Sequence, residues 1–206
     1  MTSIEDIVAE EWRQFQLVQN EGGRASCQDN FPEFQRQRES QFKAWPQQLL
    51  DSYYQDLLDA AQQGRNLLTE KYAYMMRETA PERFAAMEHL LPPVDGEKRA
   101  LVEEIVAAHL EWAEGFAAEF PLYAATGRPL KAADALTGET SIETYTRGEL
   151  STYSPRTLRL YADYIRRCRE QGVNLTREIR DNIARSLGLT GSAEAEEILA
   201  RKYGKA

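Results

Sequence analysis

The chain has 206 residues, 42% of them hydrophobic and 28% charged, with a formal net charge of −8 and a pI near 5.0. This length suits one large domain or two small ones with a real core, and the acidic charge disfavours nucleic-acid binding because phosphate backbones attract basic surfaces. The cysteine count of two excludes a disulfide-rich scaffold, and no segment reaches the length of a membrane span, so we expect a cytoplasmic protein without membrane contact.

Apolar residues recur at helical spacing along most of the chain, beginning with Ile4, Ile7 and Val8. No segment alternates apolar and polar residues with β-branched enrichment, so we predict no strand. The sequence therefore predicts an all-α fold without a sheet. We expect one compact domain of about eight or nine helices over residues 2–190, followed by a C-terminal helix in 191–206 that is either docked or mobile. The helical segments expected within the domain are 2–18, 29–45, 46–64, 66–79, 81–91, 96–120, 141–150, 156–172 and 175–188.

Polar residues that accept hydrogen bonds from a first helical turn mark where these helices begin. Thr2 with Glu5, and Thr140 with Glu143, match the capping-box pattern. Residues 121–139 show no clear period, and a loop of this length inside a compact domain is usually functional or mobile. Further N-caps are expected at Asn30, Asn66, Asp95, Ser154, Asn174 and Ser192.

Ionisable residues stand on several helix faces that are otherwise apolar: Glu11, Arg38, Lys71, His109 and Glu149. Burying a lone charge is costly, so each charged residue should pair or face a wet cavity. One interpretation is a set of buried ion pairs that hold helix to helix. The other is a polar pocket at the centre of the bundle. A lone histidine on such a face is more often a hydrogen-bonded packing residue than a ligand.

The stretch NEGGRASCQDN, residues 20–30, separates the first two helices. Its two glycines permit a tight turn, and Arg24 offers a fork of donors suited to carboxylate or phosphate. Since the stretch leads into a helix N-terminus, it could form the lip of an anion site. The alternative is a helix end followed by a turn, which accounts for the glycines and leaves Arg24 unexplained. Cys27 is a weaker candidate nucleophile, because the sequence shows no histidine partner for it.

Two further stretches, GRNLLTEKYAYMMRET and TSIETYTRGELSTYSP, are dense in charged and tyrosine side chains. Neither contains a hydrolase or metalloprotease motif. Neither histidine follows a glutamate by three residues, as a di-iron carboxylate bundle requires, so we expect no metal and no cofactor. If a metal did bind, glutamates would have to hold it.

The blocks EEWRQFQLVQNEGGRASCQDN, GRNLLTEKYAYMMRETAP and TSIETYTRGELSTYS are long and compositionally unusual. With them the sequence resembles a bacterial family catalogued as domain of unknown function 4125, over most of the chain from about Glu10 to Asn174. The resemblance implies a single domain in which the three blocks form one unit. It assigns no catalytic residue.

From the residues we expect a protein that binds a small molecule, and more specifically a cofactor-free enzyme. It would act on an anionic metabolite, an amino acid or a phosphorylated compound, by general acid/base chemistry. The alternatives are a non-catalytic module that binds a ligand or a protein partner, and a purely structural role for every buried charge. The sequence leaves the oligomeric state open. The catalytic candidates are Glu11, Glu70, Glu149 and Lys71, and the substrate-binding candidates are Arg24, Arg38, Tyr72, Tyr145 and Arg147.

Overall fold

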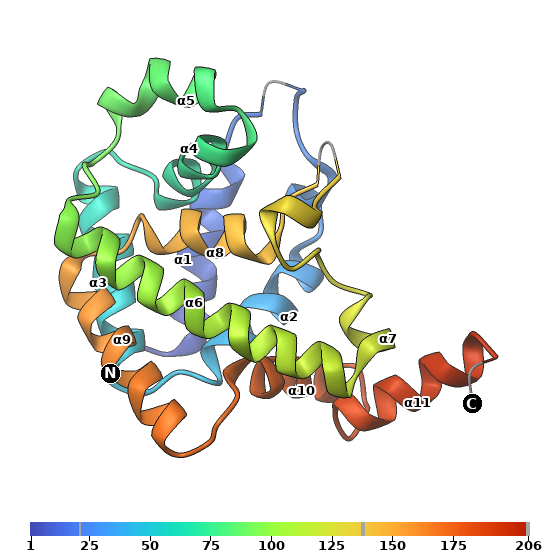
Figure 1. Cartoon of the computed structure of the whole chain (residues 1–206). Helices are drawn as coiled ribbons and strands as arrows, with labels where there is room; N and C mark the ends of the chain where they lie inside the picture. Colours follow the sequence, from blue (N-terminus) through green and yellow to red (C-terminus); the bar gives the residue numbers. More distant parts are fainter. Residues whose placement is uncertain (21, 137–138, 205–206) are drawn as a thin grey trace.

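A computed structural model describes residues 1–20, 22–136 and 139–204 (Figure 1). These residues form eleven α-helices and no strand, which confirms the all-α prediction and corrects the expected number of eight or nine helices. The number was too low partly because α7 has a single turn, too short to show a period. The helices are α1 (Ile4–Gln16), α2 (Phe31–Phe42), α3 (Gln47–Gln62), α4 (Leu67–Thr79), α5 (Pro81–Met87), α6 (Gly96–Glu119), α7 (Pro121–Ala124), α8 (Ile142–Leu150), α9 (Pro155–Glu170), α10 (Leu175–Ser186) and α11 (Ser192–Lys202). Three short 3-10 turns lie at Ser26–Asp29, Glu88–Leu90 and Ala132–Asp134.

Most of the predicted helix starts are confirmed, and the errors are shifts of one residue. The side chains of Asn30, Asn66, Asp95, Ser154 and Asn174 each accept a backbone hydrogen bond from the first turn of their helix. Ser3 with Asp6 forms the capping box of α1, in place of Thr2 with Glu5. Similarly, the N-cap of α8 is Ser141 and that of α11 is Gly191. At α1 and α8, adjacent hydroxyl residues offer equivalent caps, so the sequence alone does not choose between them, whereas Gly191 caps α11 without a side-chain hydrogen bond.

Helix α8 lies near the centre of the bundle, between α4 and α6 (Figure 1). Gly148 allows this close approach. A Cβ atom built at Gly148 would lie 2.5 Å from Met75 Cγ and 3.0 Å from the carbonyl oxygen of Lys71. The two helix backbones therefore approach more closely than any other residue would permit. This approach brings the side chain that follows, Glu149, into reach of α4.

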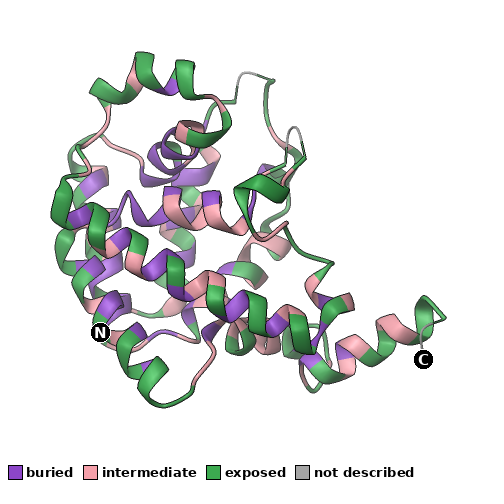
Figure 2. Cartoon of the chain, viewed as in Figure 1, coloured by how far each residue is buried: buried purple, intermediate pink, exposed green. Residues whose placement is uncertain are grey.

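The main core is formed by apolar faces of α1, α3, α4, α6, α8 and α9, and its buried residues run through the middle of the bundle (Figure 2). Tyrosine and tryptophan rings are prominent in it. Tyr53 and Tyr153 lie 4.8 Å apart between centroids, and Trp45 lies 5.0 Å from Tyr161. Such rings fill apolar space while presenting a polar tip. Their hydroxyl groups can therefore form hydrogen bonds with polar groups buried at the centre of the core.

A smaller apolar cluster joins the end of α6 to α7, α10 and α11. Helix α11 docks there, because Glu196 accepts hydrogen bonds from the backbone nitrogens of Leu122 and Tyr123 over 3.0 and 2.6 Å. The division at residue 190 stays a prediction. Parts of three predicted segments lie outside the described residues: position 21 of the first loop, 137–138 of the 121–139 stretch and 205–206 at the C-terminus. In the described part of the chain, no helix combines the length and the apolar character that crossing a membrane requires.

Candidate functional site

Four charged side chains from four different helices meet inside the bundle, and we call them the charge cluster. They are Glu11 of α1, Arg38 of α2, Lys71 of α4 and Glu149 of α8. Their exposed fractions are 0%, 5%, 3% and 7%, so each has lost nearly all contact with water. Such burial requires that the charges balance and that their hydrogen bonds are satisfied. The cluster meets the first condition with two charges of each sign.

Arg38 binds both carboxylates of the cluster. Its Nε donates to Glu11 Oε2 over 2.7 Å and its Nη2 donates to Glu11 Oε1 over 2.6 Å, which makes a two-pronged ion pair. Its Nη1 lies 3.2 Å from Glu149 Oε1. The Tyr53 hydroxyl also donates to Glu11 Oε1, over 2.6 Å. Glu11 is thus enclosed on several sides, and a ligand could reach it only after the cluster rearranged.

Glu149 is the second centre of the cluster. Lys71 Nζ donates to its Oε2 over 2.9 Å, and the Tyr153 hydroxyl donates to its Oε1 over 3.0 Å. Burial alone would raise the pKa of Glu149, but the positive charges of Arg38 and Lys71 outweigh burial and hold this pKa well below its usual value. Burial would lower the pKa of Lys71, and the negative charge of Glu149 instead keeps it above its usual value. Both groups are therefore charged at neutral pH, which makes each a weak general base or acid.

The cluster extends through Lys71 to two tyrosines. The ammonium group of Lys71 donates to the Tyr145 hydroxyl and lies 3.7 Å from the centroid of the Tyr145 ring. It lies 5.8 Å from the centroid of the Tyr72 ring. The structure thus brings together six of the nine residues selected from the sequence: Glu11, Arg38, Lys71, Tyr72, Tyr145 and Glu149.

The other three selected residues point elsewhere. Glu70 accepts hydrogen bonds from Nε and Nη2 of Arg65, both over 2.7 Å. Arg147 binds three carboxylates, one each from α4, α6 and α8. Arg24 donates to Asp29 over 2.8 Å within its own loop. These three side chains hold neighbouring segments together and contribute no group to the charge cluster.

The loop between α1 and α2 is held by side-chain bonds to its own backbone. Gln28, only 1% exposed, donates to the carbonyl oxygens of Phe15 and Val18 over 2.9 and 3.0 Å. Arg24 Nη2 donates to the carbonyl oxygen of Gln28 over 2.8 Å. Arg24 therefore has a structural explanation in the turn that ends α1.

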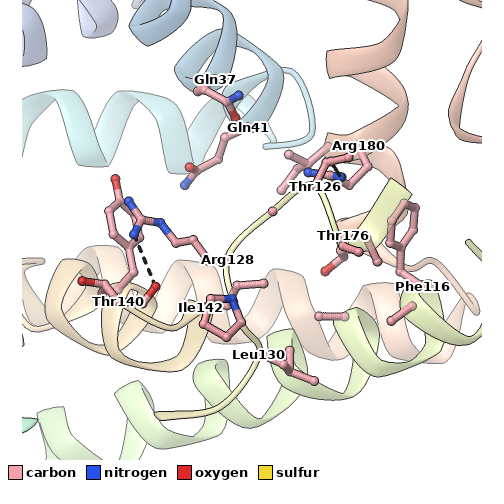
Figure 3. A pocket seen from close by; sticks show the side chains of 18 of the residues that line it. Gln37, Gln41, Phe116, Thr126, Arg128, Leu130, Thr140, Ile142, Thr176 and Arg180 are labelled. Atoms are coloured by element: carbon pink, nitrogen blue, oxygen red, sulfur yellow. Dashed lines mark hydrogen bonds between the residues drawn. The ribbon is translucent and has the colours of Figure 1, made fainter. Parts of the chain in front are cut away.

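A cavity of about 1060 Å³ opens beside the charge cluster, and we call it the main cavity. Its walls come from α2, α6, α10 and residues 121–130, with Arg38 and Tyr145 at the boundary with the cluster. Figure 3 shows Gln37 and Gln41 of α2 on the side opposite the stretch that carries Arg128. A cavity of this size, with a mixed polar and apolar lining, is typical of a small-molecule site.

Arg180 of α10 forms part of the wall of the main cavity, beside Thr126 (Figure 3). Its Nη2 donates to the Tyr123 carbonyl oxygen and, over 3.0 Å, to Thr126 Oγ1. Its guanidinium lies 4.1 Å from the centroid of the Tyr123 ring. Within 1–20, 22–136 and 139–204, no carboxylate pairs with Arg180, and its buried Nε donates to no acceptor. Burial lowers the pKa of Arg180. A bound anion would compensate both the charge and the unused donor.

Arg128 is a second cation on the same wall, and its side chain is exposed. Its Nη1 donates to the carbonyl oxygen of Thr140 over 3.3 Å, and its guanidinium lies 4.9 Å from the centroid of the Tyr145 ring. No ion pair joins Arg128 to a carboxylate of the described chain. Arg128 and Arg180 thus present two positive charges to one cavity, whose lining also includes the acidic residue Glu139.

A smaller cavity of about 170 Å³ continues inward and shares Gln41, Tyr145 and Arg180 with the main cavity. Its lining includes Glu149 and His109. His109 Nε2 lies 2.7 Å from the hydroxyl of Tyr161. Burial lowers the pKa of His109 to about 4, against a smaller opposing effect of the Glu149 charge, so the imidazole is neutral at pH 7. The inner cavity is therefore lined by a carboxylate, a neutral imidazole and the three tyrosines Tyr145, Tyr153 and Tyr161.

Neither Arg128 nor Arg180 stands out in the sequence. Arg128 lies in the stretch that has no helical period, so no pattern orients it. Arg180 follows Ile179, which also lines the cavity, on a helix rich in other arginines. His109 did carry a signal, because it interrupts the apolar face of α6.

Among the residues that the structure places, no three His, Cys, Asp or Glu side chains gather as a metal site would require. No curated protein and no solved structure gives a significant match to the chain. Residues 1–197 match the family described as "Protein of unknown function (DUF4125)". This match confirms the resemblance drawn from the three sequence blocks and extends it to both ends of the domain. The chain belongs to the DUF4125 family.

Proposed function

We propose that this protein binds a small anionic molecule in the main cavity and that Arg180 is the principal cation that holds it. The observation that carries the proposal is that the Arg180 guanidinium has no carboxylate partner among the described residues. It is half-buried on the cavity wall, its Nε has no acceptor, and no carboxylate of the described chain neutralises it. Arg38 and Arg147, by contrast, each have carboxylate partners. An unpaired, partly desolvated guanidinium favours an anion from outside.

The charge cluster is compatible with this proposal because its four charges are already paired with one another. Arg38, Lys71, Glu11 and Glu149 balance one another, so they add no net charge to the cavity wall. The hydroxyl and amide groups that line the cavity, including those of Thr126, can complete the binding of a polar ligand. The ligand classes that fit are carboxylates, amino acids among them, and phosphorylated compounds.

The test compares Arg180→Gln with Arg185→Gln, a matched control on the same helix whose side chain is exposed. Isothermal titration would measure binding of inorganic phosphate, citrate and a set of amino acids to each protein. Loss of one charge-assisted hydrogen-bond donor costs roughly 1.5–3 kcal/mol. We therefore expect Arg180→Gln to weaken anion binding about 10- to 100-fold, while Arg185→Gln binds as the wild type does. Equal affinities in all three proteins would refute the role of Arg180.

A catalytic role for the same site is the second proposal, favoured by the inner cavity. There Glu149 and His109 line one cavity. The lowered pKa of His109 leaves its neutral imidazole a weak proton acceptor, and the pKa shifts make Glu149 and Lys71 poor proton carriers as long as they remain paired. Catalysis through Glu149 would require a substrate that displaces Lys71 or Arg38. Incubation with a ligand that binds, followed by mass spectrometry of the ligand, distinguishes turnover from binding. Unaltered ligand after hours, with full occupancy, would argue for the non-catalytic alternative.

We also propose a cellular compartment and a class of ligand for the protein. We take it to act in the cytoplasm, where an exposed free thiol such as that of Cys27 stays reduced. We also take its ligand to be a small molecule and not a nucleic acid, because a net charge of −8 repels phosphate backbones.

A further inference from the structure

Another cavity, of about 290 Å³, shares Tyr145 with the main cavity, and we call it the aromatic cavity. Aromatic rings from four helices line it: Phe15 of α1, Phe34 of α2, Tyr72 of α4 and Tyr145 of α8. An apolar cavity of about 150 Å³ is large enough to hold benzene. The aromatic cavity can therefore hold a six-membered ring together with a substituent.

The rings pack against one another and form an aromatic wall of the cavity, against which a flat group can stack. Phe15 and Phe34 are stacked, with centroids 5.4 Å apart and planes 15° apart. Phe15 and Tyr72 are also near parallel, at 6.3 Å and 28°. Aromatic rings favour offset stacked or edge-to-face neighbours, and such pairs add affinity beyond the apolar area that they bury. A planar ring fits this lining better than a saturated ring of the same size.

The charges on the lining favour an anionic substituent on that ring. Glu33 is the carboxylate on the wall, and it is already paired with Arg36 and hydrogen-bonded to Gln37. Lys71 and Arg38 are neutralised within the charge cluster. Arg128 differs from them, because among the placed residues no carboxylate pairs with it.

Arg128 belongs to the walls of both cavities, together with Gln37, Arg38 and Tyr145. A single hydrogen bond of 3.3 Å and its stacking on Tyr145 hold it in place, and its side chain is exposed. It can therefore turn toward a ligand at small cost. The exposed residues Cys27 and Gln37 belong to the same lining, which places the opening of the aromatic cavity at the surface.

We propose that the aromatic cavity is a separate binding site for an aromatic carboxylate or phosphate. The ring lies among Phe15, Phe34, Tyr72 and Tyr145, and Arg128 holds the anionic group at the opening. This inference goes beyond the proposed role of Arg180, since it depends on a different cation and a different cavity.

The first experiment compares two probes of equal charge and similar size, phenyl phosphate and cyclohexyl phosphate, by isothermal titration against the wild-type protein. Inorganic phosphate and benzoate complete the set and separate the contribution of the ring from that of the anion. We expect phenyl phosphate to bind about 3- to 10-fold more tightly than cyclohexyl phosphate, from the additional ring contacts. Equal affinities, or no binding of either probe, would overturn the inference.

Variants assign the effect to this cavity. Tyr72→Leu should remove the preference for the planar ring, because it replaces an aromatic neighbour by a smaller aliphatic one. Arg128→Gln changes an exposed side chain, so the fold should be unaffected, and both probes should bind about 10-fold more weakly. Arg180→Gln should leave the preference for phenyl phosphate unchanged. If Arg180→Gln abolishes that preference, the probe occupies the main cavity and the inference fails while the proposed function stands.

Cys27 provides a readout that needs no substitution. It is exposed beside the opening, whereas Cys168 is buried, so iodoacetamide should alkylate Cys27 selectively. We expect saturating phenyl phosphate to slow this alkylation at least threefold and inorganic phosphate to leave it unchanged, as measured by mass spectrometry of the peptide. An unchanged rate at saturation would show that the ring binds elsewhere.

Discussion

Replacing Glu11 by Gln, or Arg38 by Met, leaves the charge cluster unbalanced, whereas replacing both restores its balance. In Glu11→Gln, the two cations Arg38 and Lys71 face Glu149 alone. In Arg38→Met, the carboxylates of Glu11 and Glu149 face Lys71 alone. In the double variant, Glu149 and Lys71 remain as a pair with Oε2 and Nζ 2.9 Å apart. The two substitutions should therefore be strongly coupled.

The magnitude follows from the burial of the pair. Glu11 is 0% exposed and Arg38 is 5% exposed, so either single change leaves a charge in a site that water does not reach. Removing one partner of such a pair costs roughly 3–5 kcal/mol of unfolding free energy. Gln at position 11 still accepts the hydrogen bond from Tyr53, which places that variant at the lower end. We expect the double variant to be more stable than the sum of the single losses predicts, by about 2 kcal/mol or more.

The assay is urea denaturation of the wild type and the three variants, followed by circular dichroism, with equal m-values required for the comparison. The coupling energy comes from the four unfolding free energies. The conservative change Arg185→Gln, on an exposed side chain, serves as the control for the effect of losing a charge elsewhere. Losses that add to within about 0.5 kcal/mol would mean that the two residues do not interact energetically. That result would refute the pairing of Glu11 with Arg38 in the charge cluster.

Three further predictions use the same denaturation assay. Gly148→Ala places a Cβ 2.5 Å from Met75 Cγ, so it should push α8 away from α4 and lower the unfolding free energy by about 1–3 kcal/mol. Gly96→Ala is the control, because nothing lies within 4 Å of a Cβ at that position. Equal stabilities of the two variants would contradict the close approach of α8 and α4. The pKa of His109 is lowered from 6.5 to about 4 in the folded protein. Between pH 4 and pH 6.5 the unfolded chain therefore binds more protons than the folded one, and the unfolding free energy should rise with pH, by at most about 3 kcal/mol. His109→Gln should remove that part of the slope, and an unchanged profile would show that the histidine is not buried as described. Lys71→Met leaves Glu149 without its closest cation and should lower the unfolding free energy by about 3–5 kcal/mol. A stability within about 1 kcal/mol of the wild type would show that Arg38 alone balances the Glu149 carboxylate.

The positions of the buried charges could be predicted because a helix face orients every residue on it. Glu11, Arg38, Lys71 and Glu149 each interrupt an apolar face, so each had to point inward whatever its partner. The sequence could not show which of them pair. That depends on how α8 meets α4 and α2, and the close approach at Gly148 determines it.

A helix-geometry argument explains why two of the candidate residues lie outside the charge cluster. Glu70 was selected beside Lys71, yet adjacent residues on a helix point about 100° apart, and Glu70 meets Arg65. Arg147 was selected beside Glu149, two positions away and so about 200° round the helix, and it binds surface carboxylates. Residues of one sequence block therefore do not all point toward the charge cluster. Arg24 lay in a loop, where no period indicates direction.

The charge cluster also has a consequence for how the chain folds as it is synthesised. Helices α1, α2 and α4 leave the ribosome well before Glu149 is available, so Glu11 and Arg38 can pair early while Lys71 has no carboxylate in the cluster. Burial of that lone ammonium is too costly, and α4 cannot settle in its final position until α8 has been made. Productive packing therefore waits until about three quarters of the protein has emerged, and the N-terminal half made alone should remain only partly folded.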